Sequence, residues 1–476
     1  MLFSSSTFIF IFLPIVLFVY FLIPNKFIGL KNITLFAFSL VFYAYGEPKF
    51  VFVMLGTIIC NYFFGLLISK KKNKKLVLGI GVGVNIFIIF IFKYLNFTVL
   101  NINRLLMLLS IDITITQTEI LLPIGISFFT FQAISYLIDV YRNGTLAQKN
   151  PMYLGLYISF FPQLIAGPIV RYTEINQAIN NRVVTFDNFN YGIKRFVFGL
   201  AKKVIISNSM ALISDTIWEV VGGENSISAL TAWLGAIAYT LQIYFDFSGY
   251  SDMAIGLGKM FGFNFNENFN YPYISKSISE FWRRWHISLG SWFRDYVYFP
   301  MGGSRVSSKK KLLLNLFVVW ALTGIWHGAN WTFIAWGLMH FCLISFEKIS
   351  AIPERLNTVG KFTYQIIVLI CIIIGWVIFR SEDIGIAADY ISSMFGLAEN
   401  GLIDIVFVEQ LHENIVLLLL GIIASTPLLN KSLAHITNKN VFIGEFVEII
   451  VGMTLFVISI SQLVLQSYNP FIYFNF

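Results

Sequence analysis

The chain has 476 residues, of which 57% are hydrophobic and only 12% are charged, and its mean hydropathy is +0.74. A soluble domain has about 25% charged residues, so this composition excludes a water-soluble globule, and disorder is excluded because it requires low hydrophobicity. The net charge of +8 fits basic loops that orient membrane segments better than it fits a nucleic-acid surface. The sequence therefore predicts a polytopic membrane protein. The cysteines lie in apolar runs and are interpreted as small buried hydrophobic residues, not as a disulfide framework: Cys60, Cys342 and Cys371.

Apolar segments long enough to cross a bilayer, about 20 residues each, recur along the whole chain. The first, 6–24, has no basic residue before it and no cleavage site after it, so it is expected to be a span and not a signal peptide. Segment 152–170 contains Pro162, Gly167 and Pro168 and is not expected to cross cleanly. These segments predict one all-helical membrane domain, 1–476, with about ten to twelve membrane segments. The other candidate spans are 32–45, 48–69, 77–99, 121–141, 188–215, 228–258, 312–326, 329–346, 363–380, 415–429 and 443–465.

The few charges are sorted along the sequence. The loop 70–75 reads KKKNKK, and the stretch 259–311 is also rich in Lys and Arg. Basic loops stay in the cytoplasm, so both are expected there. The stretch 381–414 carries acids but no Lys or Arg, and we expect it outside, together with the nearly uncharged termini.

This orientation bears on the uncharged stretch 312–346. Because it lies between two basic flanks, 259–311 and 348–361, it is expected to dip into the membrane and return. Its midpoint is IWHGAN, 325–330, and each arm of about 15 residues would extend about 22 Å as a helix. Non-helical backbone at that depth is tolerated only inside protein or along a water-filled cavity. We therefore expect His327 to occupy a buried intramembrane site.

An ionisable group at membrane depth is a functional hypothesis by default. The His327 imidazole could take a proton from a hydroxyl near neutral pH, and its neighbours include Trp326 and Asn330. The alternative is a packing histidine at a helix break. His340 lies in an apolar helix and is interpreted as structural. The histidines expected in loops, with no assigned role, are His412 and His435.

The stretch 277–305 contains His286 within an aromatic pattern. Residues at spacings of three and four predict an interfacial amphipathic helix with tryptophan anchors. Its arginines have two interpretations: attraction to anionic lipid, or a cytoplasmic mouth that attracts a phosphate-bearing donor such as coenzyme A or a phosphopantetheine arm. The aromatic and aliphatic positions are Phe281, Trp282, Trp285, Leu289, Trp292 and Phe293. The arginines are Arg283, Arg284, Arg294 and Arg305.

Polar residues also interrupt the membrane segment 242–256, namely Asp246, Ser248, Tyr250 and Asp252. Acids in an apolar helix do not face lipid. They either pair with Lys or Arg of neighbouring segments, or line a substrate tunnel or orient a catalytic histidine. Zinc spacing, a P-loop, a dinucleotide fingerprint and a nucleophile elbow are not found. Further candidates for the same cavity are Gln132, Gln163 and Arg171.

Two stretches carry a resemblance to a known family. Residues 244–305, which include WRRWH, and residues 322–337, which include WHGANW, resemble the membrane-bound O-acyltransferase (MBOAT) family. The similarity is greatest to its alginate O-acetyltransferase branch, close to the teichoic-acid D-alanyl transfer proteins. Segments 121–142 and 159–172 fit the same branch, so the motif-bearing core covers about 121–347.

The resemblance implies a ring of helices around a central funnel, with re-entrant and interfacial helices. It implies that His327 matches the family's essential histidine and His286 a second histidine on the cytoplasmic side. Family members move an acyl group from a cytoplasmic donor to a hydroxyl. In this branch the acceptor is an extracytoplasmic polymer, often reached through a partner acetyltransferase of the SGNH type with a serine nucleophile. Donor binding or tunnel lining is expected of Trp326, Asn330, Asp246, Ser248, Tyr250, Asp252, Arg283, Arg284, Trp285 and Arg294.

The leading hypothesis is an O-acetyltransferase in a bacterial plasma membrane that modifies a cell-surface polysaccharide. Its donor would be acetyl-CoA or an acyl-carrier thioester, with no bound cofactor or metal. A composition rich in Ile, Asn, Lys and Phe is typical of an AT-rich bacterial genome, which favours peptidoglycan, a secondary wall glycan or another exopolysaccharide over alginate. The alternatives are D-alanyl transfer to teichoic acid, a transporter or flippase that uses the buried aspartates, and a scaffold that only recruits acetylation proteins.

Overall fold

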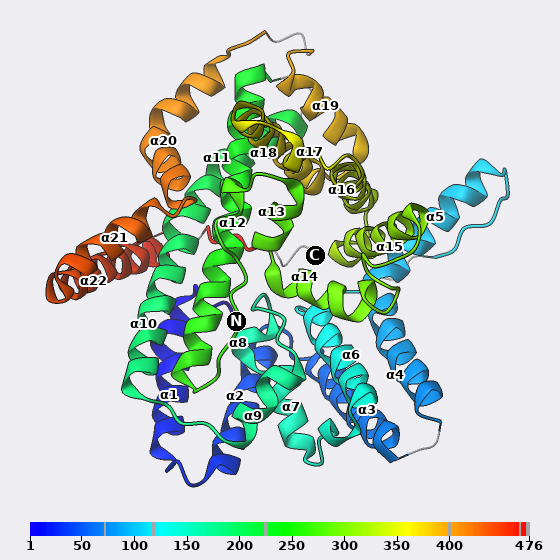
Figure 1. Ribbon diagram of the computed structural model, residues 1–476, viewed down its shortest axis with the longest axis vertical. Helices are drawn as coiled ribbons and strands as arrows, with labels where there is room; N and C mark the ends of the chain where they lie inside the picture. The colour runs from blue at the N-terminus through cyan, green and yellow to red at the C-terminus, as the bar shows by residue number, and fades with distance from the viewer. Residues whose placement is uncertain (71–72, 117–119, 223–226, 398–400, 466–467, 473–476) are drawn as a thin grey trace. The chain divides into compact units, whose positions relative to one another are not determined.

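The structure is a computed structural model that describes residues 1–70, 73–116, 120–222, 227–397, 401–465 and 468–472. Within these ranges every regular element is a helix (Figure 1). The contacts divide the chain into two units. Unit 1 is Met1–Ile193 with Ala254–Asn266, and unit 2 is Lys194–Met253 with Glu267–Phe476. The single domain expected over the whole chain stays a prediction, and each unit is described by itself.

Unit 1 is organised around α6 (Ile126–Arg142), which packs against α3, α4, α7 and α9 and buries almost its whole length. The break expected within 152–170 is confirmed, because α7 ends at Ser159 and α8 begins at Phe161 with a proline in its first turn. The other elements of unit 1 are η1 (Phe8–Phe12), α1 (Leu13–Leu22), α2 (Ile28–Gly46), α3 (Val51–Lys70), α4 (Lys74–Ile89), η2 (Phe90–Tyr94), α5 (Leu95–Leu108), η3 (Gly144–Leu146), α7 (Pro151–Ser159), α8 (Phe161–Leu164), α9 (Tyr172–Asn180) and the start of α10 (Phe186–Ala201).

Unit 2 has α12 (Ala229–Met260) in its core, up to Met253, with α11, α13 and α18 contributing to the same hydrophobic cluster (Figure 1). Its other elements are η4 (Lys202–Ser207), α11 (Asn208–Gly222), η5 (Pro272–Ile274), α13 (Ile278–Arg284), α14 (Ile287–Phe293), η6 (Arg294–Tyr298), α15 (Lys309–His327), α16 (Trp331–Ser350), α17 (Ile352–Arg355), α18 (Thr358–Arg380), α19 (Ile384–Met394), α20 (Ile405–Ala424), α21 (Leu428–Lys439) and α22 (Val441–Leu465).

Eight helical stretches in the described residues are long and apolar enough to cross a membrane. Each overlaps an expected span, so the all-helical polytopic membrane class is confirmed. The expected spans 121–141, 228–258 and 312–326 are not among the eight. The first apolar stretch, Phe8–Leu22, is helical but shorter than the others. The eight are Ile28–Gly46, Val51–Lys70, Lys74–Leu108, Phe186–Val220, Trp331–Ser350, Thr358–Arg380, Ile405–Ala424 and Val441–Leu465.

Helices α15 and α16 pack against each other and turn at 328–330, as the expected hairpin around His327 requires. Its dip into the membrane stays a prediction. Two glycines let the arms touch: a Cβ on Gly337 would lie 2.6 Å from the backbone oxygen of Trp320, and one on Gly324 would lie 2.6 Å from that of Phe333. The arms, of 19 and 20 residues, are longer than expected. At 1.5 Å per residue each is about 29 Å long, close to the thickness of a bilayer core.

The single amphipathic helix expected over 277–305 is wrong. The segment forms α13, α14 and η6, with a break at Trp285 and His286, where the His286 backbone is left-handed at φ +43°. Trp285, Trp292 and Phe293 are at most 5% exposed. The aromatic residues therefore pack inside the protein, which removes the reason for expecting a surface helix.

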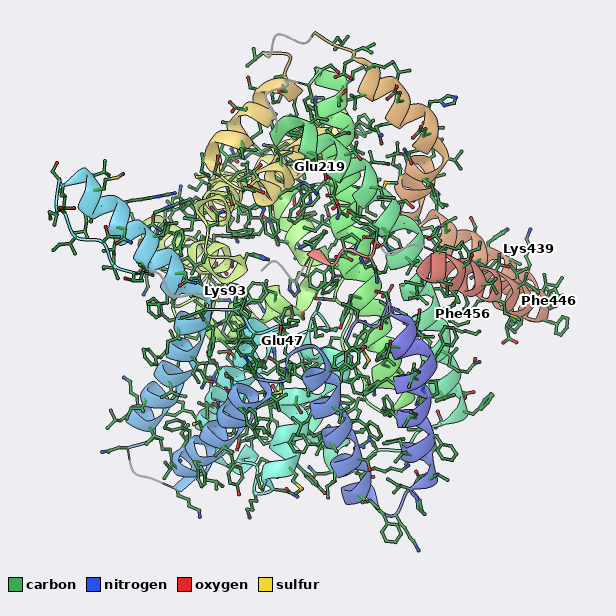
Figure 2. The ribbon with its side chains drawn as sticks, turned by 180° about the vertical axis from the view of Figure 1, so that it is seen from behind. Glu47, Lys93, Glu219, Lys439, Phe446 and Phe456 are labelled. Carbon is green, nitrogen blue, oxygen red and sulfur yellow. The ribbon has the colours of Figure 1, made fainter. Side chains whose placement is uncertain are left out.

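Helices α20 to α22 also differ in detail from expectation. His412 and His435 lie on α20 and α21, not in loops, and both are exposed. Helices α21 and α22 pair as a hairpin (Figure 2, where Lys439 and Phe446 mark them). Only 6% of the most apolar stretch of α22 is buried, as expected of a helix whose surface meets lipid.

Candidate active site

His327 is the last residue of α15 and is 4% exposed. The helix ends there because Gly328 is extended and Asn330 begins α16 by accepting a hydrogen bond from the Thr332 amide. The imidazole lies against three aromatic rings, with centroid distances of 4.9 Å to Trp326, 5.0 Å to Trp336 and 5.1 Å to Phe379. These rings belong to α15, α16 and α18, and α16 packs against both of the others. Together they hold the ring in an apolar cage at the hairpin turn.

His286 lies between α13 and α14 and is 1% exposed. Its ring is 4.6 Å from Phe247 of α12 and 6.1 Å from Trp326, and its Nδ1 lies 3.1 Å from Asn268 Oδ1. Burial lowers its pKa to about 3, so the imidazole is neutral near pH 7. The structure thus brings the two predicted catalytic histidines against one tryptophan, although His286 is buried and does not stand at an exposed mouth.

His340 has a different environment. Its Nδ1 accepts a hydrogen bond of 3.2 Å from the indole nitrogen of Trp282. Its ring also packs 5.3 Å from Trp320 and 4.8 Å from Trp336. A buried ring with Nδ1 hydrogen-bonded and two tryptophans packed against it supports the structural interpretation. Through Trp336 it also supports the cage around His327.

Both aspartates of α12 are paired, as one of the two interpretations predicted. Asp246 Oδ1 lies 2.6 Å from Lys203 Nζ. Asp252 meets Arg195 at 2.7 Å and Lys202 at 2.6 Å. The two polar residues between them, Ser248 and Tyr250, are buried. Tunnel lining by these four residues stays a prediction.

The segment 468–472 completes the surroundings of Asp246. The Ile472 amide donates to Asp246 Oδ2 at 2.9 Å, Lys203 donates to the Pro470 carbonyl oxygen, and the Phe471 ring packs 4.9 Å from Tyr250. The buried ion pair therefore depends on backbone from a part of the sequence that carries no recognisable motif.

The arginines of 277–305 have different surroundings. Arg284 pairs with Glu280 and Arg294 with Asp295, each at 2.9 Å. Arg283 and Arg305 are exposed. Trp285 is buried and packs 4.7 Å from Trp376. Donor binding by this group stays a prediction.

Three polar residues proposed for the same cavity belong to unit 1. Gln132 and Gln163 are fully buried, and Gln163 donates to the Tyr157 carbonyl oxygen at 2.6 Å. Arg171 forms the N-cap of α9. Their expected link to the histidines stays a prediction.

Several residues of the site were missed from the sequence, namely Asn268, Trp336, Phe379 and Lys203. Only Lys203 carried a signal, because a lysine inside an apolar helix requires a partner. The described ranges contain no cluster of His, Cys, Asp and Glu that could hold a metal ion.

Comparison with known proteins extends these observations. The model of the membrane-bound O-acyltransferase family matches residues 147–380, which contain His286, His327 and His340. A probable alginate O-acetylase of Azotobacter vinelandii is 37% identical over the whole of both chains. A peptidoglycan O-acetyltransferase of Helicobacter pylori is 33% identical over 100% of this chain and 98% of its own. A teichoic acid D-alanyltransferase of Bacillus subtilis is 33% identical over 47% of this chain and 60% of its own. With full-length relatives and the motif histidines buried together, the chain belongs to the membrane-bound O-acyltransferase family.

Proposed function

We propose that the chain is an O-acetyltransferase that moves an acetyl group from a cytoplasmic thioester toward hydroxyls of a cell-surface polysaccharide. The observation that carries the proposal is that His327 and His286, in the two family motifs, both lie against Trp326 and are both buried. The acetyl group is supported by full-length relatives named for O-acetylation. The D-alanyl alternative is less well supported, because that relative aligns over 47% of this chain.

The reaction needs one base at the acceptor hydroxyl. In the proposed mechanism the His327 imidazole takes the hydroxyl proton while the oxygen attacks the thioester carbonyl. A carbon–oxygen bond forms, the carbon–sulfur bond breaks, and the departing thiolate recovers the proton from the imidazolium. His286 assists by holding the donor.

The hairpin supports a proposed membrane orientation. Both of its ends carry lysines, at 309–311 and 348, which favours the cytoplasm for both. The turn with His327 then points toward the outside. The side chain of Asn330 in the turn donates to the Glu382 carbonyl oxygen at 2.6 Å, which joins the turn to the acidic stretch 381–414 that we also assign to the outside. Because the N-terminus is nearly uncharged, we assign it to the outside as well.

The donor and the partner are part of the same proposal. We assign the donor to acetyl-CoA or an acyl-carrier thioester, whose phosphates the exposed Arg283 and Arg305 could attract. The final acceptor is reached through a separate extracytoplasmic acetyltransferase of the SGNH type. The transporter alternative relies on Asp246 and Asp252. Both are held in ion pairs within unit 2, as purely structural residues are, so their burial does not favour transport.

The test is acetylation of the cell envelope. A strain without the protein is complemented with the wild type, His327→Ala or His412→Ala, and its wall polymers are analysed by mass spectrometry. His412 is an exposed histidine of α20 and serves as the matched control. We expect polymer acetyl groups to fall to background only with His327→Ala. Full acetylation by a His327→Ala protein present at the wild-type level would refute the proposal, and alanyl groups in place of acetyl groups would favour the alternative.

A further inference from the structure

Asn268, the residue in contact with His286 Nδ1, is a fully buried amide. It lies in the connection between α12 and α13, and it contacts the segment that carries His286 at several atoms. Its Oδ1 lies 3.1 Å from the Ser288 backbone nitrogen, 2.9 Å from Ser288 Oγ and 3.1 Å from His286 Nδ1. Its own carbonyl oxygen accepts from the Ile287 amide at 2.9 Å. The side chain and the backbone of this one residue together hold the turn at 286–288.

These contacts fix the orientation of the amide. A backbone N–H can only donate, so the atom of Asn268 that faces the Ser288 nitrogen must be the oxygen and not the NH2 group. The Ser288 hydroxyl, at 2.9 Å from the same oxygen, must likewise donate its single hydrogen there. That hydrogen is then not available for His286 Nδ1, which lies 3.4 Å from Ser288 Oγ.

The tautomer of His286 follows. Since Asn268 Oδ1 only accepts, Nδ1 of the neutral ring must carry the proton, and Nε2 must carry the lone pair. Among the described residues no protein group lies within hydrogen-bonding range of Nε2. A buried acceptor left in this way is costly. The left-handed backbone of His286, at φ +43°, is also costly for a residue other than glycine.

We propose that Asn268 is a positioning residue that locks His286 in the Nδ1–H tautomer and aims its Nε2 lone pair at an N–H or O–H group of the substrate. This rests on the acyl transfer proposed above, in which the donor's pantetheine arm offers amide N–H groups and the acceptor offers hydroxyls. The strained turn and the unsatisfied nitrogen then have one explanation. Both are costs of presenting a proton acceptor in an apolar interior.

His340 provides an internal contrast. Its Nδ1 accepts from Trp282, and an indole nitrogen can only donate, so His340 must be the opposite tautomer, with its proton on Nε2. His286 and His340, two of the three buried histidines of unit 2, should therefore differ in a direct measurement. With only five histidines in the chain, the ring signals can be assigned one substitution at a time.

The first test reads the tautomer and needs no turnover. Solid-state NMR of the full-length protein in lipid, with 15N-labelled histidine, distinguishes the two neutral ring forms, and His286→Gln assigns the signal. We expect His286 as Nδ1–H and His340 as Nε2–H. A His286 signal of the Nε2–H form would overturn the positioning proposal and leave the acetyl transfer itself untouched.

The second test asks whether Asn268 acts through His286. Acetyl content of the wall polymers, divided by the amount of folded protein in the membrane, is compared for Asn268→Leu, His286→Ala and the double variant. Asn268→Leu should lower this ratio by about tenfold or more. The ratio for the double variant should be no lower than for His286→Ala. Additive losses would overturn the proposal. Asn315→Leu is the matched control, since this buried amide of α15 donates to the Met301 and Gly303 carbonyl oxygens.

The conservative variant Asn268→Asp adds a pH readout. It keeps the acceptor oxygens but places a carboxylate beside Nδ1, which favours the charged imidazole. The side chains around His286 are Phe247 of α12, Ser288 of α14 and Trp326 of α15, none of which is charged. We expect Asn268→Asp to be active near pH 8 and to lose activity as the pH falls, with an acid limb that the wild type does not share. Identical pH profiles would contradict a role exerted through the imidazole.

Discussion

Lys203 and Asp246 form an ion pair inside unit 2 whose loss should be among the most damaging single changes in the chain. Both side chains are 1% exposed and their charged atoms lie 2.6 Å apart. Lys203→Met fills a similar volume but leaves the Asp246 carboxylate buried without its counter-charge. Breaking one side of a buried pair costs about 3–5 kcal/mol. The hydrogen bond from the Ile472 amide remains, so we expect a loss near the lower end, about 3 kcal/mol.

The assay is reversible unfolding of the purified protein in mixed micelles, followed by tryptophan fluorescence. A loss of about 3 kcal/mol changes the unfolding equilibrium constant by about 100-fold. The double variant Lys203→Met with Asp246→Leu removes both charges, and we expect it to recover most of the stability, since apolar replacement of a whole buried pair is often nearly neutral.

Lys202→Met is the matched control, one residue away. Lys202 is 34% exposed, and its partner Asp252 keeps Arg195, so the loss should be below about 1 kcal/mol. Equal losses for Lys202→Met and Lys203→Met would refute the reasoning from burial. A double variant as unstable as the sum of the two single changes would refute the reasoning from pairing.

Three further outcomes can be checked. Gly337→Ala should push α15 from α16, because its Cβ would lie 2.6 Å from the Trp320 backbone oxygen; overpacking costs about 1–3 kcal/mol, and a wild-type thermal midpoint would contradict it. Glu347→Gln should loosen α13, because the carboxylate accepts from the first two amides of that helix at 2.6 and 2.9 Å. Limited proteolysis at α13 that is no faster than in the wild type would contradict this. Burial lowers the pKa of His286 to about 3, so the unfolded chain binds the proton first, and stability is lost as the pH falls from about 6.5 toward 3. His286→Gln should reduce the dependence of the free energy of unfolding on pH over this range. The same dependence in the variant and the wild type would contradict the prediction.

The order of the helices and the hairpin at His327 could be predicted, because apolar length and the placement of lysines are local properties of the sequence. The pairing of the α12 aspartates could also be predicted, since an acid in an apolar helix requires a cation. The partners themselves could not, because Lys203 and Asp246 lie on different helices and meet only through packing.

The break at His286 shows why the rest could not be predicted. Spacings of three and four over 277–305 fit a helix as well as they fit a folded-back segment that buries its aromatic residues. The folded-back arrangement depends on Asn268, 18 residues away in sequence from His286, whose contacts hold the left-handed turn there. Propensity and periodicity carry no information about such a contact.

The backbone bond between Ile472 and Asp246 has a consequence for biosynthesis. The two residues are 226 positions apart, and at about 5–20 residues per second of synthesis the amide donor becomes available about 10–45 s after the acid. During that time the Asp246 carboxylate lacks this hydrogen-bond donor. The hydrogen bond from Ile472 to Asp246 therefore forms late, after the other helices of unit 2 have been synthesised.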